Sequence, residues 1–183
     1  IAAALGFVFF STACDRQATD EPGDILLVTI DTLRADHLGL YGYERPTSPQ
    51  IDRLFRDSAI FERAYSTEAN TSPSIVSLLT GLTPPEHRVR LLYQLLPEEL
   101  QLLPELLPET YQSAAFVANV VLTDEAIGLA NRFDHYDDQV DENVFPPGQV
   151  KVYERSARGT TDAALAWLRE KRDPDRPLFL WIH

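Results

Sequence analysis

Three short, continuously apolar runs constrain the fold of this 183-residue chain more than any other feature. They are residues 25–30 (ILLVTI), 114–121 (AAFVANVV) and 178–182 (LFLWI). Apolar runs of this length are typical of parallel strands that are buried on both faces of a sheet. Helical patterns separate the runs, so the sequence predicts an α/β fold with a mostly parallel central sheet between helices.

The segments between these runs predict the other elements. Ser48 and Pro49 open one helix, a second is expected around residues 100–107, and a short strand is expected over residues 59–65. Residues 160–172 form an amphipathic pattern with Thr160 as its cap and basic residues in the last turn.

The segment NTSPSIVSLLTG (residues 70–81) predicts a short helix with Ser72 as its cap, Pro73 in the first turn and Gly81 as its stop. Thr71 then precedes the helix, where unpaired backbone N–H groups and the helix dipole favour anions and a hydroxyl that loses its proton. The alternative is that Thr71 only contributes to capping.

Polar side chains stand at or near the ends of the first two apolar runs. Asp31 follows the first run, and ligands of open α/β sheets collect beyond the carboxyl ends of the strands. A carboxylate there is costly unless it is paired or binds a metal, so Asp31 is either a metal ligand or a residue that caps the next turn or pairs with Arg34. Asn119 interrupts the second run and either points into the same site or makes a turn.

Composition limits the partners of the chain. Its net charge is −12 and its pI is near 4.6, which argues against a nucleic-acid partner. An anionic substrate is still compatible, because a bound cation reverses the local field. Cys14 is the single cysteine, which excludes an internal disulfide framework and a cysteine-rich zinc site.

The first 14 residues are similar to a bacterial lipoprotein signal that lacks its basic start. Residues 1–10 are apolar but too short to span a bilayer as a helix of about 20 residues, and three small residues then precede Cys14. This similarity implies lipidation of Cys14, a polar tether over residues 15–23, and export to the bacterial envelope or periplasm with a lipid anchor in the membrane. The alternative is an ordinary secretory signal that is cut nearby.

Several motifs follow one another between Asp24 and His183. The most specific is ILLVTIDTLRADHLGLYGYERPTSPQIDRL, followed by Ala64-Tyr65 and SPSIVSLLTG; weaker ones are the His87 region, AAFVAN, FDHYDD and LFLWIH. Together they resemble the N-terminal part of the sulfatase family, within the alkaline-phosphatase-like superfamily. The resemblance implies a truncated catalytic domain over residues 24–183 that attacks sulfate or phosphate esters through a nucleophile bound to a divalent cation, with calcium favoured over zinc.

The resemblance also implies roles for particular residues. Asp31 falls on a metal-binding aspartate, and Thr71 falls on the nucleophile, which also binds the metal. Thr32 stands where the family has a second aspartate, whereas Ser74 and His87 are candidates for site support. A lone histidine after a proline pair is more often structural, which is the alternative for His87.

Two stretches depart from the family pattern. Residues 71–75 read TSPSI where sulfatases have C/S-x-P-S-R, and Asn119 stands where the family has a lysine. A threonine cannot become the formylglycine aldehyde of true sulfatases, but it can attack phosphorus as a metal-bound alkoxide. Asn119 is therefore another candidate for site support, in place of a cation.

Three functions are compatible with this pattern. The first is an exported, metal-dependent sulfatase-like hydrolase of small-molecule, glycan or lipid esters, of which this piece holds half a metal site and is inactive alone. The second is an envelope transferase that uses Thr71 to carry a phosphoryl-linked group. The third is a binding protein that kept the fold and lost the chemistry. The first two require Asp31 and Thr71 to lie within about 8 Å of each other, the reach of one shared ion.

Overall fold

A four-stranded parallel sheet forms the centre of the molecule. The computed structural model describes residues 22–143 and 152–183. The strand order is β1 (Ile25–Val28), β6 (Leu178–Ile182), β2 (Gln112–Phe116) and β3 (His135–Asp137), and every pairing is parallel. The α/β class with a mostly parallel sheet is thereby confirmed. The expectations for the leader, including Cys14, lie outside the described residues.

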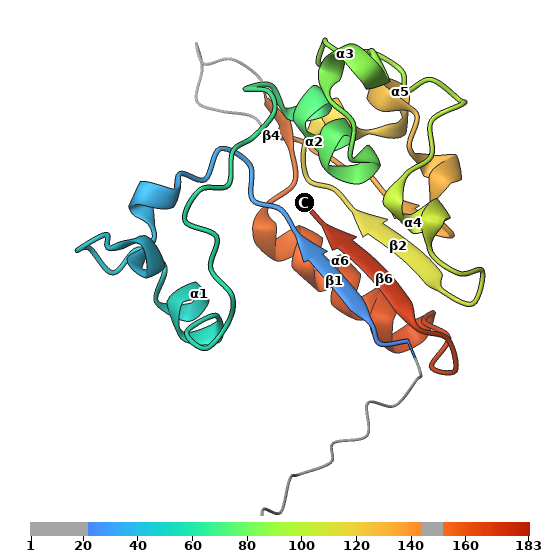
Figure 1. Cartoon of the computed structure of the whole chain (residues 1–183). Coiled ribbons are helices and arrows are strands. Elements are labelled where there is room, and N and C mark those ends of the chain that lie inside the picture. The colour runs from blue at the N-terminus through green and yellow to red at the C-terminus, as the bar shows by residue number, and fades with distance from the viewer. Residues whose placement is uncertain (1–21, 144–151) are drawn as a thin grey trace, which may run out of the picture.

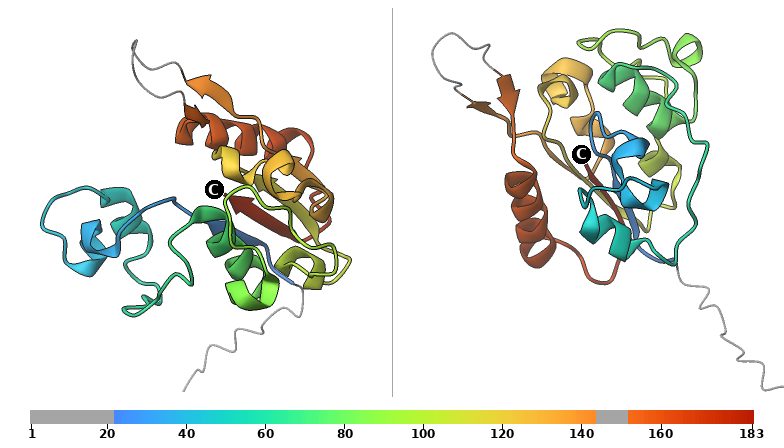
Figure 2. Two further views of the ribbon diagram at one scale, coloured as in Figure 1. Left: turned by 90° about the horizontal axis from the view of Figure 1, so that it is seen from above. Right: turned by 90° about the vertical axis from the view of Figure 1, so that its left-hand side faces the viewer.

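Helices cover both faces of the sheet (Figure 1). One face carries α2 (Thr71–Thr80), α3 (Pro84–His87), α4 (Leu103–Leu106) and α5 (Asp124–Ile127), and the other carries α6 (Ala157–Glu170). Two views at right angles show the sheet between these layers and the segment around α1 (Pro49–Leu54) projecting beside it (Figure 2). The remaining elements are short: η1 (Ala35–His37), η2 (Gly39–Tyr41), η3 (Val120–Leu122), η4 (Ala130–Arg132) and an antiparallel pair, β4 (Asp141–Asn143) with β5 (Val152–Glu154).

Two apolar clusters hold these layers together. Under α2, the rings of Phe133, Phe179 and Trp181 stack with centroid separations of 6.0–6.3 Å. Under α6, Trp167 packs edge-on against Phe116, 6.1 Å between centroids. Burying an aromatic side chain of this size contributes about 2–3 kcal/mol, so these clusters fix the sheet on which the site is built.

The first apolar run differs from its prediction, because β1 is an edge strand of the described sheet. Ile25 and Leu27 pack on the α2 side, whereas Leu26 is 62% exposed and Val28 is 54% exposed. The helix that covers this second face, α6, packs on β2 and β6 instead. The expectation of a strand buried on both faces is therefore wrong for β1. It is confirmed for β6, in which Leu178–Trp181 are buried.

Three further local predictions are corrected. Residues 59–65 form turns and irregular backbone rather than a strand. The helix expected from Thr160 begins at Ala157, and Ser156 caps it by accepting a hydrogen bond from the Gly159 N–H at 3.1 Å. The helix expected over 100–107 is the single turn α4, with Pro104 near its start. In the part of the chain that the structure describes, no helix is long and apolar enough to cross a membrane.

Candidate active site

The carboxyl ends of three neighbouring strands place the central polar residues of the site. Val28 of β1 and Phe116 of β2 are both in register with Ile182 of β6, so the three strands end at one level. Asp31 and Asn119 follow the first two strands, and His183 follows the third. The arrangement agrees with the rule that ligands collect beyond the carboxyl ends of parallel strands.

Helix α2 brings Thr71 to the same edge. The helix begins at Thr71, with Asn70 in the extended conformation at the N-cap, and ends at Gly81 in the left-handed region with a φ of 71°. The Gly81 stop is as predicted, whereas the Ser72 cap is wrong. The buried Ser72 hydroxyl instead faces the carbonyl oxygens of Leu92 and Val121, at 2.7 and 3.0 Å. Ser72 thus anchors α2 to two loops, and the backbone N–H groups of the first turn remain directed at the site.

Thr71 and Asp31 are in direct contact. The Thr71 hydroxyl lies 3.3 Å from each carboxylate oxygen of Asp31 and donates to them. This separation is well inside the limit of about 8 Å for two ligands of one ion. Asp31 itself is exposed, so its charge bears little of the desolvation cost expected from the sequence.

Asn119 orients the Asp31 carboxylate. Its amide oxygen accepts the backbone N–H of Val121 at 3.1 Å, which directs its amide nitrogen toward Asp31. That nitrogen donates to Oδ2 of Asp31 at 2.8 Å. Of the residues that the sequence proposed for site support, Asn119 therefore makes direct contact with the candidate metal ligand.

Two hollows of about 550 and 410 Å³ flank this group. Asp31, Thr32 and His183 line both of them, Asn119 and Arg155 line the larger one, and Thr71 and Ser74 line the smaller one. Among the described residues that line the two hollows, Arg155 is the only arginine or lysine. Its guanidinium is paired with the Asp137 carboxylate at 2.7 Å. The Asp31–Thr71 contact thus lies between two spaces that a substrate can enter.

Two of the remaining candidates stay near the site. Thr32 has a φ of 54°, a left-handed conformation that costs a β-branched residue about 1–3 kcal/mol and holds the turn after Asp31. Ser74 lies one turn along α2 from Thr71, and its hydroxyl is 2.8 Å from that of Ser66.

The structure does not bring His87 to the site. Its ring is fully buried, its Nδ1 accepts the Val89 N–H at 3.1 Å, and its Nε2 lies 2.9 Å from the Ser77 hydroxyl. Burial lowers the pKa of His87. His87 lines neither hollow, so it ties α3 to the far end of α2, as the structural alternative expected.

Thr71 and Asp31 present oxygen atoms at a spacing that one cation can bridge. Adjacent oxygen ligands of a calcium ion, with bonds of about 2.3–2.6 Å, lie roughly 3.3–3.7 Å apart, which the observed 3.3 Å matches. Among residues 22–143 and 152–183, however, no group of three or more His, Cys, Asp or Glu side chains is placed to hold a metal ion. The spacing of Thr71 and Asp31 therefore fits a cation, but the described residues do not supply the remaining ligands of such an ion.

Thr29 and His183 also belong to the site, although neither is among the candidates predicted from the sequence. The Thr29 hydroxyl lies 2.7 Å from Nδ1 of His183 and accepts the indole N–H of Trp181 at 3.0 Å. His183 follows the third apolar run directly, so the reasoning that selected Asp31 applies equally to it. Burial lowers the pKa of His183, and the nearby Asp31 charge opposes this shift.

The fold places this site in a known structural class. The chain superposes on BT4656 in complex with its substrate D-glucosamine-2-N,6-O-disulfate with a TM-score of 0.68, at 21% identity over 88% of this chain and 34% of that chain. The phosphonate monoester hydrolase of Agrobacterium radiobacter gives a TM-score of 0.64, at 19% identity over 88% of this chain and 40% of that one. The architecture is therefore the alkaline-phosphatase-like α/β fold.

Sequence comparison identifies the family within that class. The family model described as Sulfatase matches residues 24–183, so this chain belongs to the sulfatase family. Iduronate 2-sulfatase of Mus musculus is 42% identical over 79 residues, which are 43% of this chain and 14% of that protein. N-acetylgalactosamine-6-sulfatase of Canis lupus familiaris is 29% identical over 138 residues, 66% of this chain and 26% of that protein. The chain thus spans 14% and 26% of the length of these two curated relatives.

Proposed function

We propose that this chain forms the N-terminal part of the active site of a sulfatase-like hydrolase, in which Thr71 is the nucleophile and Asp31 a metal ligand. The observation that carries the proposal is the contact between the Thr71 hydroxyl and both Asp31 oxygens at 3.3 Å, at the first residue of α2. The substrate is a sulfate or phosphate ester.

The surroundings of Thr71 favour a nucleophilic role. Asp31 accepts the hydroxyl proton in a hydrogen bond, and Asn119 holds that carboxylate in place. The N-terminal turn of α2 directs its dipole at the Thr71 oxygen and stabilises the negative charge that develops there. Attack on the ester sulfur or phosphorus releases the alcohol, and water then cleaves the ester formed on Thr71.

A divalent cation is part of this proposal. Sulfatases generally use a divalent metal ion, and here Asp31 and Thr71 would hold it. When bound, the ion supplies Lewis-acid stabilisation and lowers the pKa of a bound hydroxyl. The donors are a carboxylate and a hydroxyl, oxygen ligands that suit calcium better than zinc, so we propose calcium.

The relatives favour sulfated sugars as the substrate class. Their names specify sulfated iduronate and N-acetylgalactosamine, and BT4656 was solved with D-glucosamine-2-N,6-O-disulfate. Thr71 leaves phosphate esters as the second class, because a threonine adduct on phosphorus needs no aldehyde. We therefore propose a glycan ester first and a phosphoryl-carrying transferase second.

One observation favours a site with weakened chemistry. Ile75, which replaces the arginine of the family pattern, is 6% exposed and packs in the core under α2. A missing charged donor typically costs about a hundredfold in rate. A binding protein without turnover is the outcome if neither a released product nor a Thr71 adduct is detected.

The test compares Thr71→Ala and Thr71→Ser in the protein expressed from its own gene. Initial rates are measured with an aryl sulfate, a sulfated glucosamine and a phosphodiester, with and without calcium. We expect the alanine variant to lose turnover, the serine variant to keep it, and the intact mass of the wild type to report a Thr71 adduct. Full activity of the alanine variant would show that Thr71 is not the nucleophile. Chain 1–183 by itself is expected to bind calcium weakly and to turn over none of these esters.

Export is the remaining part of the proposal. The apolar residues 1–10 and the small residues before Cys14 support a lipoprotein signal with lipidation of that cysteine. Cys14→Ser is expected to move the protein from the membrane fraction to the soluble fraction of the envelope. Unchanged fractionation would contradict the lipid anchor.

A further inference from the structure

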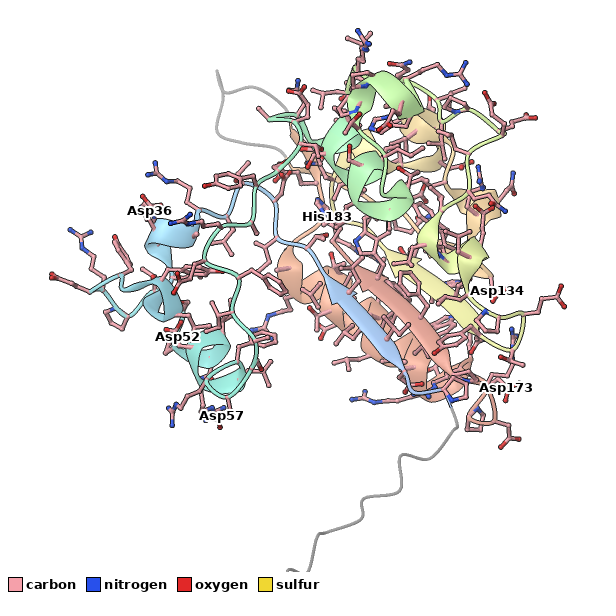
Figure 3. All side chains as sticks on the ribbon, viewed as in Figure 1. Asp36, Asp52, Asp57, Asp134, Asp173 and His183 are labelled. Carbon is pink, nitrogen blue, oxygen red and sulfur yellow. The ribbon has the colours of Figure 1, made fainter. Side chains whose placement is uncertain are left out.

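His183 occupies a central position that the proposed mechanism does not use. It lies at the tip of β6, between the strands that lead to Asp31 and Asn119 (Figure 3). Its backbone N–H donates to the carbonyl oxygen of Phe116 at 2.9 Å, which fixes the residue to the sheet. His183 and Asp31 line the same two hollows.

A hydrogen-bond chain from the core reaches one ring nitrogen of His183, Nδ1. The indole nitrogen of Trp181 is a donor only, and it donates to the Thr29 hydroxyl at 3.0 Å. That hydroxyl lies 2.7 Å from Nδ1 of His183, and its single proton is available for donation to that nitrogen. With Nδ1 as the acceptor, the neutral ring carries its own proton on Nε2.

The other ring nitrogen, Nε2, is an orphan polar atom. The Nε2 atom is closed to solvent and has no hydrogen-bond partner among the described residues. Such buried unpaired groups are rare in folded proteins, and each requires a physical explanation. Because Nε2 is closed to solvent, a partner for it among the described residues has to come from the wall of the site.

Asp31 is the acceptor that the arrangement offers. A carboxylate accepts about four hydrogen bonds, and the described donors to Asp31 are the amide of Asn119 and the hydroxyl of Thr71. Asp31 and His183 follow neighbouring strands of the sheet and line the same two hollows. Acceptor capacity therefore remains on Asp31 for one further donor.

We propose that His183 is a positioning residue for Asp31: in the loaded site its Nε2–H donates to the Asp31 carboxylate, and Trp181 and Thr29 hold the ring in the tautomer that permits this bond. The inference rests on the proposed role of Asp31. In this proposal, Trp181 and Thr29 orient the His183 ring, and the ring orients the Asp31 carboxylate. Groups that orient a metal-binding residue in this way commonly change metal affinity or activity by about 10–100-fold.

The first test reads the tautomer directly and needs no activity. Nitrogen-15 NMR of the chain, with the His183 signals assigned by their loss in His183→Gln, is expected to show the proton on Nε2. Thr29→Val removes the hydroxyl and is expected to transfer part or all of the population to the Nδ1–H tautomer. Thr161→Val is the control, because its hydroxyl bonds to Ala157 of its own helix. A wild-type ring with its proton on Nδ1 would overturn the inference.

The second test separates positioning from packing. Calcium titration and steady-state kinetics compare His183→Gln, which keeps an N–H near the Nε2 position, with His183→Phe, which keeps the ring volume. We expect the phenylalanine variant to lose about tenfold or more in calcium affinity or kcat and the glutamine variant to recover most of it. Equal losses in both variants would show a packing role and contradict the proposal.

The two proposals fail in different ways. If Thr71→Ala keeps full turnover, the nucleophile is wrong, whereas the tautomer and the difference between the His183 variants can still be measured. If the Thr29→Val effect on calcium affinity persists unchanged in a His183→Phe background, the chain through His183 is wrong, whatever Thr71 does. Loss of the Thr29→Val effect in that background is the expected result.

Discussion

The two ends of helix α2 carry similar side chains in opposite environments. At its start, the Thr71 hydroxyl is partly exposed and contacts Asp31 at a long 3.3 Å. Toward its end, the Ser77 hydroxyl is buried and contacts His87 at 2.9 Å, and the other ring nitrogen of His87 is also bonded. The buried end is fully satisfied and fixes the fold, whereas the other end leaves hydrogen-bonding capacity beside a hollow.

The same contrast separates the fully buried His87 from the partly buried His183. His87 is fully buried and has a partner at each ring nitrogen. His183 has one satisfied nitrogen and one orphan, and it lies between two hollows. We therefore use the hydrogen bonding of the second ring nitrogen as the criterion: a histidine bonded at both nitrogens is structural, and one with an unpartnered nitrogen belongs to the site. Mutations can test this criterion.

The largest effect is expected for Thr71→Ala at the start of α2. Loss of the nucleophile is expected to reduce kcat by about a thousandfold or more. Because Thr71 makes no core contact, the free energy of unfolding is expected to change by less than about 0.5 kcal/mol. Rates and urea denaturation of the same preparation measure both quantities. A large stability loss without a rate loss would reverse the contrast between the two ends of α2.

A second, smaller effect on rate is expected for Asn119→Ala. This change removes the amide that donates to Asp31 at 2.8 Å and leaves the Val121 N–H without its side-chain acceptor. We expect a roughly 10–100-fold loss in kcat, since one oriented donor at the site is lost. Asn119→Asp is the matched variant, because it keeps the acceptor for Val121 but places a negative charge against Asp31. If the aspartate variant is as active as the wild type, Asn119 does not orient the carboxylate.

At the other end of α2, Ser77→Ala is expected to change stability and not rate. The buried Nε2 of His87 loses its partner, and an unsatisfied buried donor costs about 1–3 kcal/mol. Urea denaturation measures the loss, and kcat at saturating substrate is expected to remain within about twofold. A rate loss comparable to that of Asn119→Ala would connect this end of the helix to the site.

Sequence patterns predict the sheet and half of the site because both depend on local order along the chain. Asp31 follows the first apolar run and Asn119 interrupts the second, and parallel strands bring both residues to one edge of the sheet. The exposed face of β1 could not be predicted, because exposure depends on which strands a helix covers. The role of Ser72 depends on carbonyl groups 20 and 49 residues away, and the chain from Trp181 to Thr29 joins residues 152 positions apart.

The pH dependence of the unfolding free energy tests the burial of three histidines, among them His87 and His183. Burial lowers the pKa of His87, His135 and His183 below the ordinary value of 6.5, so the unfolded chain binds protons that the folded chain does not. Stability is therefore expected to fall as the pH drops below about 6.5 and to level off above it. Urea denaturation at pH 5, 6 and 7 measures this slope, and replacing a histidine by glutamine is expected to reduce it.

The smallest effect is expected for Ser74→Ala, one turn along α2 from Thr71. Ser74 lines the smaller hollow, but its hydroxyl is already bonded to Ser66 at 2.8 Å, so its loss exposes no buried charge and empties no core position. We expect less than about a threefold change in kcat/KM and less than about 0.5 kcal/mol in unfolding free energy. A tenfold rise in KM with kcat unchanged would instead mean that Ser74 contacts the bound ester, because such a change removes binding common to substrate and transition state. Comparing the changes in KM and kcat of Ser74→Ala therefore shows whether the substrate-binding surface extends along α2 from Thr71 to Ser74.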